Sequence, residues 1–195
     1  MIKRFSNSSI RGGHKTTKLW DQVSFAGDFE SIATTTVGAG GTTDVTFSSI
    51  PQTYTHLQIR GISRATAAIG DQMLYFQLNG DTSTNYSYHA VSGAGASAAS
   101  AGTASASFLI AQQSPGNNKA ASIYGGYVID ILDYANTNKF KTTRCIGGFD
   151  ANGSGELGLT SGNWRNTNAI TSIKLYLGIY NFAQYSSFAL YGIRA

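Results

Sequence analysis

The chain has little of several residue types, and each shortage excludes a class of protein. Of its 195 residues, one is cysteine, two are proline and 12% are charged. A single cysteine allows no intrachain disulfide, so the fold must rest on packing and hydrogen bonds. No apolar run reaches the roughly 18 residues of a membrane-spanning helix, and Ser6 and Asn7 come soon after Lys3 and Arg4, where a signal peptide has its apolar segment. We expect a soluble protein that contacts no membrane and is made in a reducing cytoplasm.

The first twenty residues lack acidic side chains and carry five of the 14 Lys and Arg residues. The five are Lys3, Arg4, Arg11, Lys15 and Lys18. The remaining nine Lys and Arg stand against ten Asp and Glu, so residues 21–195 have no basic surplus to offer phosphates. We therefore expect no nucleic-acid binding. Residues 1–28, with Trp20, are expected to form a basic arm that docks onto an acidic protein surface, ahead of one domain over residues 29–195.

Apolar residues alternate with polar ones along much of the chain, and β-branched residues are frequent. This pattern predicts about ten strands and no helix. The candidate strands are residues 29–37, 42–50, 56–65, 72–79, 85–91, 107–111, 122–134, 140–149, 155–160, 169–180 and 186–193. The most regular alternation puts Ile173, Leu175, Leu177 and Ile179 on one face. The fold class expected is an all-β, antiparallel β-sandwich of jelly-roll type with an extended N-terminal arm.

Turn-forming residues suggest how some strands are joined. Glycines 38, 40 and 41 predict a hairpin over residues 29–50, and Asn79-Gly80-Asp81 predicts a second over residues 72–91. A third is expected around residues 150–154. Residues 92–107 contain no large side chain and cannot form a core of their own, so we expect a long surface loop there.

Residue patterns that carry chemistry are scarce. Asp130 and Asp133 are three apart on an expected strand, so their side chains leave on opposite faces and form no local acid and base pair. The three histidines, His14, His56 and His89, occur singly, without the short spacing of metal ligands. These patterns predict neither catalysis nor a metal site.

Two weaker signals concern a cation site and a thiol. Residues 150–156 resemble the opening of a calcium loop, but Ser161 occupies the position of the bidentate Glu, which favours a hairpin turn over a cation site. Cys145 lies in a strand-like segment, where a cysteine is usually a small core residue. We expect no enzyme and no cofactor. A glycan-cleaving activity would require Asp130, Asp150 and Glu156 to converge in the fold.

Aromatic residues give a binding signal with two interpretations. Trp164 and Arg165 lie in a polar segment, residues 161–168, that would suit contact with a sugar ring, but Trp164 would equally suit the end of the core. Tyr176 and Tyr180 fall opposite the Ile and Leu face, either as exposed platforms or as contacts to another subunit. The four residues are our candidates for glycan contact.

Several segments together resemble a known family. Residues 31–51 (SIATTTVGAGGTTDVTFSSIP), 133–139 (DYANTNK), 162–165 (GNWR) and 184–193 (QYSSFALYGI) are similar to virion surface proteins of tailed bacteriophages, especially cyanophages and other marine phages. The resemblance implies a β-sandwich of capsid decoration proteins or short tail fibres, commonly in threefold assemblies. It supplies no catalytic residues.

These inferences combine into one expected function. The chain would be a virion structural protein, assembled in the host cytoplasm and carried on the virion surface. Its basic arm would dock onto other virion proteins, of the capsid or of the neck and tail, while the β-sandwich associates with further copies as a homo-oligomer, a trimer by resemblance. Capsid decoration is slightly preferred. The alternative is a tail-fibre adhesin that binds host surface glycans.

Overall fold

The structure is a computed structural model that describes residues 28–68 and 70–194. Those residues form twelve β-strands, and none of them belongs to a helix that could span a membrane. The strands are β1 (Phe29–Thr36), β2 (Asp44–Phe47), β3 (His56–Ser63), β4 (Gln72–Leu78), β5 (Tyr86–Ala94), β6 (Ser97–Ala106), β7 (Leu109–Ser114), β8 (Gly125–Leu132), β9 (Lys141–Asp150), β10 (Gly155–Trp164), β11 (Ile173–Tyr176) and β12 (Ser187–Ile193). The docking residues predicted in the arm lie outside the described residues: Lys3, Arg4, Arg11, Lys15, Lys18 and Trp20.

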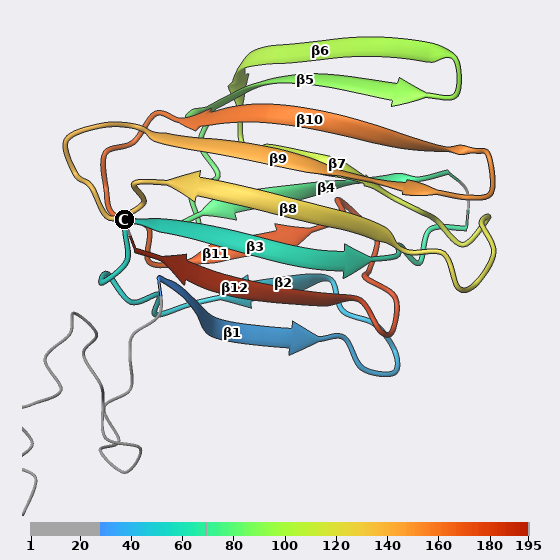
Figure 1. The fold of residues 1–195 in the computed structure, drawn as a ribbon, viewed down its shortest axis with the longest axis horizontal. Coiled ribbons are helices and arrows are strands. Elements are labelled where there is room, and N and C mark those ends of the chain that lie inside the picture. The colour runs from blue at the N-terminus through green and yellow to red at the C-terminus, as the bar shows by residue number, and fades with distance from the viewer. Residues whose placement is uncertain (1–27, 69, 195) are drawn as a thin grey trace, which may run out of the picture.

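The strands form two antiparallel sheets that pack face to face (Figure 1). The larger sheet has eight strands in the order β1-β12-β3-β8-β9-β10-β5-β6, and the smaller has four in the order β2-β11-β4-β7. The predicted all-β antiparallel sandwich is confirmed. The jelly-roll assignment within that class stays a prediction.

Two of the three predicted hairpins are wrong. Strand β1 pairs with β12 and β2 pairs with β11, so residues 29–50 arch from one sheet to the other. Strands β4 and β5 likewise belong to different sheets, which removes the hairpin over residues 72–91. Alternation fixes which side chains share a face, but it does not name the neighbouring strand. The third hairpin is confirmed, since β9 and β10 pair around residues 151–154.

The loop predicted over residues 92–107 is also wrong. Strands β5 and β6 form a long hairpin there, with Ala94 paired to Ser97 around a two-residue turn. Gly95 in that turn has a φ of 59°, a conformation that glycine adopts without steric cost. Side-chain volume predicted no core for this segment, but pairing with β5 provides the ladder that makes β6 a strand.

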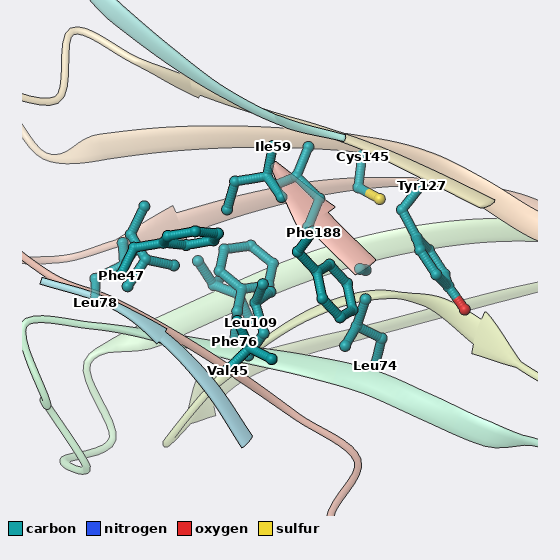
Figure 2. Packing of buried hydrophobic residues seen from close by; sticks show 14 of the residues in the cluster. Val45, Phe47, Ile59, Leu74, Phe76, Leu78, Leu109, Tyr127, Cys145 and Phe188 are labelled. Carbon is teal, nitrogen blue, oxygen red and sulfur yellow. The ribbon is translucent and has the colours of Figure 1, made fainter. Parts of the chain in front are cut away.

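Side chains from the inner faces of both sheets form the core (Figure 2). Ile59 comes from β3 of the larger sheet, whereas Phe47 and Leu78 come from β2 and β4 of the smaller one, and all three are at most 4% exposed. Leu57 shares the inner face with Ile59, as the alternation in residues 56–65 predicted. The core therefore joins the two layers along the chain's predicted apolar faces.

The alternation over residues 169–180 is only partly realised. Ile173, Leu175 and Leu177 are buried as predicted. Ile179, however, is 91% exposed, because the chain turns at Gly178, whose φ is 66°. Of the strand predicted over residues 169–180, only Ile173–Tyr176 forms a strand, β11.

A buried lysine fixes the loops at one end of the sandwich. The Nζ of Lys141 donates hydrogen bonds to the carbonyl oxygens of Asn136, Lys139 and Thr167, at 2.5 to 3.1 Å. All three ammonium donors are thereby satisfied, which a buried cation requires. Burial lowers the pKa of Lys141. The side chain is thus a structural tie between the loops that follow β8 and β10.

Candidate functional site

Trp164 belongs to the core. It is 1% exposed, its ring lies 6.3 Å from that of Tyr86, and its Nε1–H donates a 2.7 Å hydrogen bond to Asp81. The interpretation that places this residue at the end of the core is therefore confirmed. A buried indole has no face to offer a sugar ring.

The other three candidates for glycan contact each have contacts of their own. Arg165 donates hydrogen bonds to the carbonyl oxygens of Ala104 and Thr84, at 2.8 and 2.6 Å, so its guanidinium joins β6 to the loop before β5. Tyr176 lies on the outer face of the smaller sheet, next to the ring of another tyrosine. Tyr180 follows the turn after β11 and packs partly against the core. The four residues share no exposed site.

Asp130 is held apart from the other two carboxylates considered for catalysis, Asp150 and Glu156, which both line one groove. Asp130 accepts a hydrogen bond from Gln58 at 2.8 Å and lies opposite Arg144 in the β8–β9 pairing. Asp150 lies six residues beyond Arg144 along β9, and at the rise of a strand this separation is roughly 20 Å. Its Oδ1 accepts the backbone N–H of Asn152, as in an ordinary hairpin turn. Across residues 28–68 and 70–194, no group of three or more His, Cys, Asp and Glu side chains is placed to hold a metal ion.

Cys145 is an inert core residue. Its side chain is 4% exposed, in the layer between the sheets (Figure 2). Burial raises the pKa of the thiol to about 12, so no nucleophilic thiolate forms at neutral pH. The cysteine prediction is therefore confirmed.

The most unusual feature of the described residues is the outer face of the larger sheet, where β9 and β10 reverse the usual burial of apolar residues. In β10, Leu157 and Leu159 are 63% and 54% exposed, while Gly158 between them is buried. Gln112 from β7 is the reason, since its side chain occupies the space that a side chain at residue 158 would need. Gln112 thus fills the space inside Gly158, and the large apolar residues of β10 lie outside.

These outward residues continue into a row across four strands. Val128, Ile146, Leu159 and Val91 are register partners on β8, β9, β10 and β5. Ile146, Leu159 and Val91 are each about half exposed, at 47%, 54% and 50%. A contiguous apolar row of this kind on an exposed sheet face is typical of an interaction surface.

Beside the row lies a groove of about 720 Å³ with a glycine floor. Gly126, Gly148 and Gly93 line it together with Leu157, and they follow one another across the register of β8, β9, β10 and β5. Three positions without side chains in one cross-strand row lower the surface. The glycine row therefore forms the floor of the groove, and Gly153 and Ser154 of the β9–β10 turn line it as well.

A polar row borders the apolar one on its other side. Asp130, Arg144, Ser161 and His89 are paired in order across the same four strands, and they line a second hollow of about 600 Å³. An apolar centre with a hydrogen-bonding margin is the usual composition of a protein interface. The apolar row, the groove and the polar row together make up one region of the larger sheet, and below "the outer face" means this region alone.

The sequence prediction did not identify the outer face. A signal was present in residues 155–160 (GELGLT), where leucines alternate with glycine and threonine. Alternation alone places the leucines in a core, and only the contact of Gln112 with Gly158 reveals the reversed orientation.

No family model, curated protein or solved structure matches the chain. The resemblance to phage virion proteins rests on the sequence segments alone.

Proposed function

We propose that the chain is a structural protein of a bacteriophage virion, which docks through residues 1–28 and associates through its β-sandwich with further copies or other virion proteins. The observation that carries the proposal is the outer face, because half-exposed leucine, isoleucine and valine side chains in one row favour a protein partner. Decoration of the capsid is favoured over the neck or tail. The resemblance favours three copies.

The proposal assigns the chain no catalytic activity, no cofactor and no nucleic acid. The separation of Asp130 from Asp150, the unreactive thiol of Cys145 and the lack of a basic surplus in residues 21–195 support this assignment. The expected place of action is the virion surface, after assembly in the host cytoplasm.

We also propose that the sandwich is a jelly roll. The chain passes between the sheets at β1–β2, β2–β3, β3–β4, β4–β5, β6–β7, β7–β8, β10–β11 and β11–β12. Strands β8, β9 and β10 form a meander, which we count as one strand. The smaller sheet then has the order β2-β11-β4-β7, and the larger contains the order β3-(β8-β9-β10)-β5-β6. These orders match the two four-stranded sheets of a jelly roll. Strands β1 and β12 extend the larger sheet.

The arm gives the direct test. Cells that assemble the particle are supplied with the full chain or with a chain lacking residues 1–27, and purified particles are probed for each. We expect the full chain in the particle and the shortened chain, still folded by circular dichroism, in the unbound fraction. Replacing only the five basic residues of the arm by Gln is the matched control for charge.

Two results decide against parts of the proposal. Normal incorporation of the shortened chain contradicts docking by the arm. Absence of the full chain from particles contradicts the virion function itself.

A tail-fibre adhesin is the second candidate, and the polar row that lines the second hollow favours it, because sugars pair hydrogen bonds with apolar contact. Trp164→Ala does not discriminate, since the residue is buried. Arg144→Ala and His89→Ala alter only exposed positions. Loss of host adsorption with intact particles would support the adhesin; unchanged adsorption would leave the structural role.

A further inference from the structure

Strand β6 is an open edge of the larger sheet. It pairs on one side with β5 and with no other strand of residues 28–68 and 70–194 (Figure 1). Eight of its ten residues are exposed, so the strand is uncovered on both faces as well as along its edge. An exposed row of backbone donors and acceptors is a template for pairing with another strand.

The other three sheet edges each carry a feature that prevents such pairing. Strand β1 has a bulge between Ser31 and Ala33 and a charged residue, Glu30. Strand β2 is only four residues long and begins at Asp44. Strand β7 packs beneath β9 and β10 and is followed by Pro115. Bulges, charge, short length and cover are the usual means of protecting an edge.

Strand β6 has none of these over most of its length. Its residues are only Ser, Ala, Gly and Thr, and the chain contains no Lys, Arg, Asp or Glu between Asp81 and Lys119. The one bulge of the β5–β6 pair falls near Ala106, at the far end, and leaves residues 97–103 in regular register. Alanine, glycine and serine are weak strand formers, so the strand depends on its ladder to β5 and on the hydrogen bond from Arg165 to Ala104.

We propose that β6 pairs antiparallel with β6 of a second copy, so that two larger sheets continue across a two-fold axis. The inference rests on the self-association in the proposed function and names its contact. The two-fold contact gives pairs of chains, in contrast to the threefold assembly that the resemblance implies.

The register of the hairpin identifies the backbone groups that make the contact. Ala94 and Ser97 flank the two-residue turn and form a hydrogen-bonded pair, so N–H and C=O groups alternate from there along β6. Those of Ala98, Ser100 and Gly102 point away from β5. Pairing centred on Ser100 brings small residues opposite small residues, with no charge repulsion and no steric conflict.

Charge decides between a second copy and the basic arm as the occupant. The arm carries five basic residues, whereas β6 offers no carboxylate to attract them. The described chain also begins at Asp28, next to β1, at the opposite edge of the sheet. A second β6, which is uncharged, fits this edge better than the arm.

The test measures the mass of the full chain in solution by light scattering coupled to size-exclusion chromatography. We expect two copies for the wild-type chain and one for Ser100→Lys, because the two lysines would lie opposite each other at the axis. Ala98→Lys, on the same strand face, should act alike. The matched control is Thr35→Lys on the exposed edge strand β1, which should remain a pair.

Each other outcome overturns the proposal. A single-copy or three-copy wild-type chain contradicts the two-fold contact, as does a Ser100→Lys variant that melts like wild type and stays paired. Loss of pairing on removal of residues 1–27, with β6 intact, identifies the arm as the occupant instead. Particle incorporation is scored separately, so paired chains that never enter particles contradict the virion function and leave the β6 contact standing.

Discussion

The two ends of the larger sheet are held in different ways. At the β1 end, the ring of Phe29 stacks on Tyr191 at 4.7 Å, and the guanidinium of Arg60 lies 5.0 Å from the Phe29 ring. Glu30 accepts a 2.8 Å hydrogen bond from Tyr54. At the β6 end, the strand itself contributes no large side chain, and Arg165 reaches it from the end of β10.

The difference indicates which end is complete within one chain. Side-chain contacts across β1, β12 and β3 close the first end, and the bulge discourages further pairing. The β6 end instead depends on residues outside the strand: the buried Trp164, its acceptor Asp81, and Arg165. Strand β6 is held only on its β5 side, so its other edge is available to a partner.

The largest expected effect is at Trp164. We predict that Trp164→Ala lowers the free energy of unfolding by about 3–5 kcal/mol, since it empties a core site and leaves Asp81 without its indole donor. Phe29→Ala, the matched change at the β1 end, should cost about 1 kcal/mol because the ring is 43% exposed. Urea unfolding followed by fluorescence or circular dichroism measures both. Equal costs would mean that the two ends are not anchored differently.

A smaller effect is expected at Arg165. Its removal in Arg165→Ala leaves the carbonyls of Ala104 and Thr84 to water, at a cost of about 1 kcal/mol. The β6 amides should exchange with solvent hydrogen faster, while those of β1 stay unchanged. Arg60→Ala is the control at the other end and should leave β6 exchange as it is. Unchanged β6 exchange in Arg165→Ala would show that β5 alone fixes the strand.

The sequence predicted the sandwich because inner residues such as Ile59 and Leu175 alternate in long, regular strands. It did not predict pairing, since β1 finds β12 at the other end of the chain. Strand β6 was missed for a physical reason: its side chains bury little surface, so only a neighbouring ladder makes it a strand. The outer face was missed because Gly158 is inside and Leu159 outside, the reverse of what hydrophobicity alone indicates.

The smallest expected effect is the loss of stabilisation by Asp81 at acidic pH. Burial raises the pKa of Asp81, but hydrogen bonds from Asn85, Trp164 and Ser83 outweigh burial, so the pKa lies below its ordinary value. A carboxyl group with a depressed folded-state pKa stabilises the fold above its unfolded pKa of about 3.9, and that contribution is lost as the pH falls through the folded value.

Asp81→Asn should therefore unfold more readily than wild type at pH 6, with the difference shrinking below about pH 4. The change is modest because the side chain is partly exposed and water screens it. Urea midpoints at pH 6 and pH 3 measure it. A pH-independent difference for Asp81→Asn would mean that the indole contact, and not the charge, supports the β6 end.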